Sequence, residues 1–217
     1  MYNENMSKYP IYLEMSGRRA VVIGAGAVAL RKVQALSEAG ARVIVAAEHI
    51  NPSLEQGFAL PNVEMVISSY SKDFLVGATL AIAATNDAVL NRQIYQDCQS
   101  LEVLCNVVDE PQLCDFYVPA VVRRGDLQIA IGTNGNCPAY AGHLREKLEA
   151  MFSDTHGAFV SELEKVRKRI IAEIADPNQR KALMGSLASD ESYSFFASHG
   201  AEGWNRQYMS HIQSSKK

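Results

Sequence analysis

The residues with the clearest chemical signature form a glycine-rich turn near the N-terminus. Gly24, Gly26 and Ala29 have the spacing G-x-G-x-x-A directly after an apolar run at 19–23. The first glycine permits a tight turn, the second lets backbone approach a pyrophosphate, and the small third residue allows close packing of helix and strand. Free N–H groups and the positive end of the following helix attract phosphates. The pattern predicts a dinucleotide site; the alternative is a plain strand-to-helix turn.

An acidic residue after the second predicted strand favours NAD as the dinucleotide. Glu48 lies about 20 residues beyond the turn, where a carboxylate accepts hydrogen bonds from the adenosine ribose. A carboxylate at this position repels the 2′-phosphate of NADP, although Arg31 and Lys32 on the preceding helix are available for phosphate. The alternative for Glu48 is a solvated surface side chain.

A polar loop follows the apolar run at 80–84. Thr85, Asn86 and Asp87 would lie on the same rim as the glycine turn, where a loop can reach the nicotinamide side of the cofactor. The alternative is a helix N-cap formed by Asn86 or Asp87. The two roles are compatible.

Asp109 follows the apolar run at 102–108 and is the candidate proton acceptor. A carboxylate at the rim of a cleft is expected to be partly desolvated, which raises its basicity. It could then take a proton while hydride leaves to NAD. The alternative is a turn-forming aspartate before Glu110 and Pro111.

The elements that must position these residues follow from the hydrophobic pattern. The predicted strands are continuous apolar runs, which are typical of a parallel sheet covered on both faces. We therefore expect an α/β fold with a Rossmann-like, doubly wound parallel sheet. Its strands are predicted at 19–23, 42–46, 63–68, 80–84 and 102–108, and its helices at 28–39, 51–57 and 85–99.

The pattern changes after residue 115. Extended runs at 116–122 and 127–131 flank the turn 123–126 and predict a β-hairpin, and a helix follows at 138–152. This segment is too small for its own core and should borrow one from the first domain or a second subunit. Residues 153–217 read as helical. The expected division is an NAD-binding domain at 1–115, a dimerisation hairpin and helix at 116–152, and a helical C-terminal domain at 153–217.

Composition argues against several classes of function. A net charge of −3 gives no nucleic-acid signature. No apolar run approaches the ~20 residues that span a bilayer, and the polar N-terminus lacks the apolar core of a signal peptide. We therefore expect no membrane association and a cytoplasmic location. The four cysteines and five histidines are scattered without metal-ligand spacing, so we expect buried free thiols rather than disulfides or zinc.

Several short blocks occur in a characteristic order: 24–32 (GAGAVALRK), 83–87 (AATND), 105–109 (CNVVD), 133–135 (TNG), 137–138 (CP) and 144–148 (LREKL). Together they resemble the precorrin-2 dehydrogenase family, the N-terminal part of sirohaem synthase and its single-function relatives. The resemblance covers about residues 8 to 152 and extends loosely into the helical tail. The chain differs in three places: Ala25 replaces a frequent glycine, 132–135 replaces a more Ser/Gly-rich loop, and no methyltransferase domain is expected to follow.

The resemblance implies an NAD-dependent oxidation of precorrin-2 to sirohydrochlorin, on the route to sirohaem or cobalamin. It implies a homodimer whose hairpin-and-helix segments interlock, and some members also insert Fe²⁺ or Co²⁺ into the product. By position it implies that Asp109 is the essential carboxylate and that Thr133 lies beside the tetrapyrrole. The predicted cofactor residues are Gly24, Gly26, Ala27, Val28, Glu48, His49, Thr85 and Asn86.

Basic side chains on the hairpin and the following helix could meet the carboxylates of such a substrate. They are Arg123, Arg124, His143, Arg145 and Lys147, and the alternative for each is a solvated surface charge. The predicted substrate-binding residues are Thr133, Asn134, Arg124 and Arg145. A metal site is not predicted.

A competing hypothesis is a non-catalytic, NAD-sensing regulatory domain of the type attached to ion channels. It uses the same glycine turn. It gives no reason for the block that ends at Asp109 or for the basic hairpin.

Overall fold

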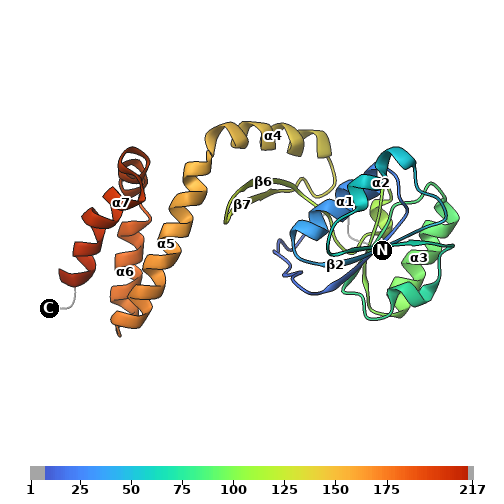
Figure 1. Ribbon diagram of the computed structural model, residues 1–217, viewed down its shortest axis with the longest axis horizontal. Coiled ribbons are helices and arrows are strands. Elements are labelled where there is room, and N and C mark those ends of the chain that lie inside the picture. Colours follow the sequence, from blue (N-terminus) through green and yellow to red (C-terminus); the bar gives the residue numbers. More distant parts are fainter. Residues whose placement is uncertain (1–7, 215–217) are drawn as a thin grey trace. The chain divides into compact units, whose positions relative to one another are not determined.

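The computed structural model describes the backbone of residues 8–214 and the side chains of residues 8–208. Internal contacts divide the chain into two compact units, one ending at Val118 and the other beginning at Pro119. The first unit contains the glycine turn, and the second contains the hairpin and the C-terminal helices (Figure 1).

In its described residues, the first unit forms a five-stranded parallel sheet in the order β3-β2-β1-β4-β5. This confirms the predicted Rossmann-like sheet. The chain order reverses between β1 and β4, so their carboxyl ends flank the crevice where such sheets bind ligands. The strands are β1 (Arg19–Ile23), β2 (Arg42–Ala47), β3 (Val63–Ile67), β4 (Leu80–Ala83) and β5 (Leu104–Val107), and the helices are α1 (Ala27–Glu38), α2 (Pro52–Phe58) and α3 (Ala88–Ser100).

Alternate residues of the strands enter two separate hydrophobic cores. Val22 packs in a core with Val33 of α1 and Phe58 of α2. Val21 packs in a different core with Ile94 of α3. Because both faces of the sheet are covered, both side-chain sets of each central strand must be apolar, which explains the continuous apolar runs.

Polar caps define where the helices of this unit begin. The Asn51 side chain accepts a hydrogen bond from the Ser53 N–H at 3.0 Å and starts α2 at Pro52, as predicted. Asp87 caps α3 by accepting hydrogen bonds from the N–H groups of Val89 and Leu90 at 2.8 and 3.1 Å. Of the two candidates for this cap, Asp87 rather than Asn86 fills the position.

The second unit begins with the predicted hairpin. Strands β6 (Ala120–Arg124) and β7 (Leu127–Ile131) are antiparallel, and the pairing of Arg124 with Leu127 leaves Gly125 and Asp126 as the loop. The first strand starts at Ala120 rather than at residue 116, because the carbonyl of Phe116 is hydrogen-bonded to Asn106 in the first unit.

The helices of the second unit are α4 (Pro138–Met151), α5 (Asp154–Glu173), α6 (Pro177–Leu187) and α7 (Asp190–Ser214). The last three share a core that includes Phe159, Phe196 and Trp204. A break in α7 at Gly200, where φ is 66°, separates two helical pieces.

The four cysteines are free; Cys98 and Cys105 are buried as predicted, whereas Cys137 is exposed. Among the described residues, no helix combines the length and the apolar character needed to cross a bilayer.

The hairpin packs directly on α5 at Gly157. A Cβ at this position would overlap the carbonyl oxygen of Arg124 and lie 2.6 Å from its carbonyl carbon. The backbone of the hairpin at Arg124 lies so close to α5 that there is no room for a side chain at Gly157.

We therefore expect Gly157→Ala to lower the free energy of unfolding of the second unit by about 1–3 kcal/mol, the usual cost of overpacking. Urea unfolding followed by the fluorescence of Trp204, the one tryptophan of the chain, measures this unit. The matched control is Gly185→Ala in α6, where a Cβ has nothing within 4 Å. It should be neutral or stabilising, because alanine favours a helix over glycine. Equal unfolding midpoints for the two variants would contradict the close-approach argument.

Candidate functional site

Gly24 directly follows β1, at the crevice where the strand order reverses. Its φ is +112°, and a Cβ would overlap the carbonyl oxygen of Ala84 and lie 2.8 Å from its carbon. The Gly24 N–H donates to the carbonyl of Ala46 at 2.9 Å. The turn is thus pressed against the end of β4, and only glycine fits there.

Gly26 is the N-cap residue of α1 and leaves its first turn open. The cap has no side-chain hydrogen bond, and a Cβ on Gly26 would meet nothing within 4 Å. The N–H groups of Ala27 and Val28 belong to the first turn, which has no intrahelical partner for its amides. Open space, unoccupied amides and the positive end of the helix fit a pyrophosphate.

Glu48 and His49 follow β2, which lies next to β1 in the sheet, and both are exposed. One carboxylate oxygen of Glu48 accepts a hydrogen bond from the Ser69 hydroxyl at 2.8 Å. Ser69 was not predicted; it lies just beyond β3, whose pairing with β2 brings it beside Glu48. The side chain of Glu48 is therefore held at the edge that carries the glycine turn.

Thr85 helps to fix the conformation of the loop that follows β4. Its hydroxyl donates to Oδ1 of Asn91 at 2.7 Å, and Nδ2 of Asn91 donates back to the Thr85 carbonyl at 3.0 Å. Asn86 follows on the same loop and is exposed. Asn91, which the sequence did not single out, is buried on α3 and holds this loop in place.

Asp109 lies in a turn directly after β5. The Glu110 N–H donates to the Val107 carbonyl at 3.3 Å, and Asp109 has a φ of +63°. Aspartate tolerates this left-handed region better than most residues. The turn-forming interpretation is correct, but the predicted partial desolvation is wrong, because the residue is exposed. The Val108 N–H donates to the Ala83 carbonyl at 2.9 Å. This hydrogen bond keeps the turn at Asp109 next to the loop that follows β4.

The structure therefore brings the glycine turn, Glu48, the Thr85 loop and Asp109 to one edge of the first unit. The predicted substrate-binding residues belong to the second unit. Among the described residues, no group of three or more His, Cys, Asp or Glu side chains is arranged to hold a metal ion.

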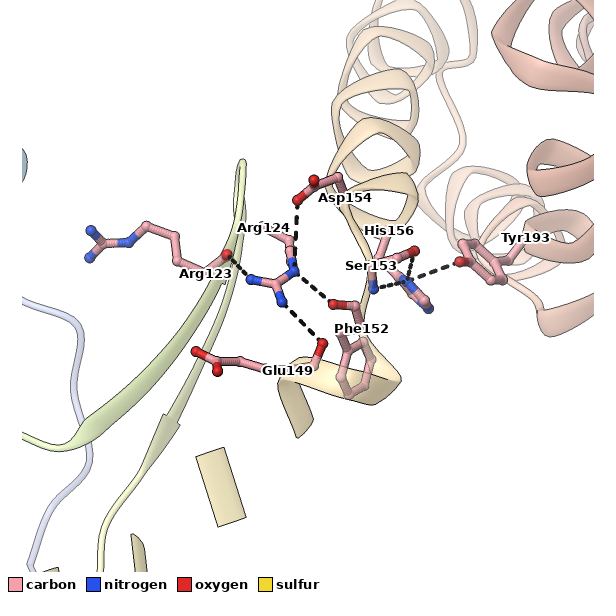
Figure 2. Close-up of polar contacts among 8 residues, drawn as sticks. All are labelled: Arg123, Arg124, Glu149, Phe152, Ser153, Asp154, His156 and Tyr193. Atoms are coloured by element: carbon pink, nitrogen blue, oxygen red, sulfur yellow. Dashed lines mark hydrogen bonds and ion pairs between the residues drawn. The ribbon is translucent and has the colours of Figure 1, made fainter. Parts of the chain in front are cut away.

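Arg124 is engaged inside the second unit. Its Nε donates to the Phe152 carbonyl at 2.7 Å and its Nη2 to the Glu149 carbonyl at 3.0 Å, while Asp154 lies 3.7 Å from Nε (Figure 2). These carbonyls end α4, where a cation satisfies otherwise unpaired acceptors. The side chain holds the hairpin, α4 and α5 together, so the structure favours a structural role over the predicted substrate contact.

Arg145 is half-buried on α4 and forms an ion pair with Glu149 at 2.6 Å.

The Thr133 hydroxyl accepts a hydrogen bond from the Cys137 N–H at 3.2 Å and helps to form the loop before α4. In this loop Asn134 has a φ of +54° and is exposed.

Comparison with known proteins gives matches along most of the chain. Residues 11–120 match the family described as putative NAD(P)-binding, and residues 124–151 match the family described as sirohaem biosynthesis protein central. The siroheme synthase of Psychrobacter arcticus is 36% identical over 169 residues, which cover 78% of this chain and 31% of that protein. The siroheme synthase of Pseudomonas putida is 36% identical over 176 residues, covering 81% of this chain and 38% of that protein. The chain thus spans about a third of the length of these relatives.

A solved structure shares the fold. The structure of SirC, a precorrin-2 dehydrogenase, matches with a TM-score of 0.76 and 20% sequence identity, covering 95% of this chain and all of that one.

The open face at Gly26 leads to a direct test of dinucleotide binding. Gly26→Ala should fold normally, because the backbone is extended at φ −84° and the new methyl meets no protein atom. The methyl would occupy the approach to the α1 amides, so we expect the Kd for NAD to rise about tenfold or more, which corresponds to at least ~1.4 kcal/mol. Calorimetric titration and thermal unfolding measure the two effects, with Gly185→Ala as the control. Unchanged affinity would place the pyrophosphate elsewhere.

Proposed function

This chain belongs to the putative NAD(P)-binding family over residues 11–120, and from this premise we propose that it oxidises precorrin-2 to sirohydrochlorin with NAD as hydride acceptor. The observation that carries the proposal is the order of the two matched families in one chain: the NAD(P)-binding segment is followed at 124–151 by the sirohaem biosynthesis segment. The similarity to siroheme synthases supports the same substrate. These relatives do not favour an NAD-sensing regulatory domain.

NAD bound at the glycine turn would supply the hydride acceptor. Gly24 lets the turn close on β4, and Gly26, Ala27 and Val28 present backbone to the pyrophosphate. Glu48, held by Ser69, would accept hydrogen bonds from the ribose hydroxyls and disfavour the 2′-phosphate of NADP. Thr85, His49 and Asn86 on the flanking loops complete the proposed cofactor set, and His49 and Asn86 are exposed.

Asp109 is the proposed proton acceptor. Dehydrogenation removes a hydride and a proton from the substrate, and a positioned carboxylate is suited to take the proton. Asp109 stands at the end of β5, next to the β4 loop, with its side chain exposed to an incoming ligand. The carboxylate would return the proton to solvent after the product leaves.

Thr133, Asn134 and Arg145 are the residues we propose for contact with the substrate. The Arg145 side chain is 35% exposed and forms ion pairs with Glu149 at 2.6 Å and Glu146 at 3.6 Å, so a substrate carboxylate would compete with these two partners. We further propose a homodimer and a cytoplasmic location, with which the free cysteines agree. Fe²⁺ or Co²⁺ would be a second substrate if the enzyme also inserts metal into sirohydrochlorin.

The central test is anaerobic incubation of the protein with precorrin-2 and NAD. The wild-type protein should form NADH and the absorbance of sirohydrochlorin. Asp109→Ala should bind NAD with unchanged Kd and lose turnover by about 10²-fold or more, because it lacks the proton acceptor. Glu110→Ala, in the same exposed turn, is the matched control and should remain active.

An unchanged rate for Asp109→Ala would remove this residue from its role. NAD binding by the wild-type protein without NADH formation would favour the regulatory-domain alternative. Addition of Fe²⁺ or Co²⁺ to the product of the same reaction tests metal insertion.

Cofactor choice gives an independent prediction. Glu48→Gln removes the negative charge, so we expect weaker NAD binding and stronger NADP binding, with the ratio of the two affinities changing by about tenfold. Ser69→Ala keeps the negative charge of Glu48 and removes only the hydroxyl that orients it. We therefore expect a smaller change in the ratio of NAD to NADP affinity than in Glu48→Gln. If Glu48→Gln and the wild-type protein had the same ratio of NAD to NADP affinity, the Glu48 carboxylate would not face the ribose.

A further inference from the structure

Two polar side chains are buried among the described residues of the first unit, and both are asparagines. Asn91 is 6% exposed and Asn106 is 9% exposed. A buried amide is costly unless its hydrogen bonds are made, so each needs a reason to be there. Asn91 holds the Thr85 loop of the proposed cofactor site. Asn106 lies near the end of β5, shortly before the turn that carries Asp109.

Asn106 anchors the segment that returns along β5 after this turn. Its Nδ2 donates to the Phe116 carbonyl at 2.9 Å and to Sγ of Cys114 at 3.4 Å. Its backbone forms an antiparallel bridge with Cys114. The returning chain is therefore fixed to β5 by Asn106 together with its neighbour Cys105, whose carbonyl accepts a hydrogen bond from the Asp115 N–H and whose N–H donates to the Asp115 carboxylate, both at 2.8 Å.

Cys114 contacts the chain on both sides of Asp109. Its thiol lies 3.2 Å from the carbonyl oxygen of Val107 and 3.3 Å from that of Glu110, so the single S–H can donate to either, or be shared between, the two residues that bracket the turn. Burial raises the pKa of Cys114, which keeps the thiol protonated and able to donate. The left-handed conformation of Asp109 is held between these two carbonyls.

We propose that Asn106 is the positioning residue for Asp109: it fixes Cys114 and Phe116, and through Cys114 it fixes the turn that presents the carboxylate. The inference rests on the proposed function, in which Asp109 accepts the proton. A carboxylate displaced by about 1 Å can lose 10²-fold in rate, because proton transfer requires hydrogen-bond distance.

The two buried asparagines provide a matched pair of variants. Asn106→Ala should lower kcat for precorrin-2 oxidation by about 10- to 100-fold and leave the Kd for NAD within twofold of wild type. Asn91→Ala deletes a side chain of the same size and similar burial on the cofactor side, so it should raise the Kd for NAD instead. Comparable losses of kcat and of NAD affinity in both variants would overturn the proposal, because that is the result of general destabilisation.

Cys114 gives a second pair that does not depend on the fold tolerating a lost asparagine. Cys114→Ala removes the donor to Val107 and Glu110 and should lower kcat, whereas Cys114→Ser restores a donor and should recover most of the rate. Equal rates for the alanine and serine variants would overturn the proposed path from Asn106 to Asp109.

Hydrogen exchange separates a failure of this inference from a failure of the proposed function. Asn106→Ala should lose protection at the Glu110 and Leu113 amides, which are bonded within the turn region, and keep it in β1 and β4. If the wild-type protein does not oxidise precorrin-2, the proposed function is overturned, and this measurement still decides whether Asn106 holds the turn. Unchanged protection at these amides would overturn the positioning role.

Discussion

The close approach of β1 and β4 is the constraint on which the first unit depends. The turn at Gly24 packs against the carbonyl of Ala84 without any side chain between them. A Cβ there would push apart the two strands that flank the crevice, and with them the first turn of α1 and the Thr85 loop. Two residues further on, Gly26 has open space beside it and no side chain caps the first turn of α1. The closed side at Gly24 and the open side at Gly26 together form a face on which a dinucleotide can lie.

Polar groups in this unit are placed where they control loops rather than where they add to the core. The strands contribute apolar side chains to both faces, and the two buried amides lie beside loops at the carboxyl edge. Since the free energy of an unpaired buried amide is high, each loop conformation is coupled to the integrity of a hydrogen-bonded cluster. This arrangement gives rigid loops at the edge of a sheet whose central strands are almost entirely apolar.

Local signals in the sequence were sufficient for much of this architecture. The spacing around Gly24 and Gly26, the apolar runs and the Gly125–Asp126 loop depend on backbone geometry between near neighbours, and the structure confirms them. Asn91, Asn106 and Ser69 were missed, because their partners come from other elements and no periodic pattern marks such contacts. The exposure of Asp109 was missed for the same reason: a strand pattern predicts where the strand ends but not how the following turn is covered. Arg124 could not be distinguished from a surface charge, because its acceptors are carbonyls at the end of α4, whose position is set by packing.

The contacts of Arg124 also explain what the C-terminal helices contribute. A two-stranded hairpin has too little surface for a core of its own, and the sequence suggested that it borrows one from the first domain or from a second subunit. Within the second unit the hairpin packs against α5, which comes so close at Gly157 that only glycine fits. The start of α5 is fixed in turn by His156, whose Nδ1 accepts from the Ser153 N–H at 3.2 Å and lies 2.9 Å from the Tyr193 hydroxyl of α7 (Figure 2). Hairpin, α4, α5 and α7 are thereby linked through Arg124 and His156, so the helical tail is the support that the hairpin lacks on its own.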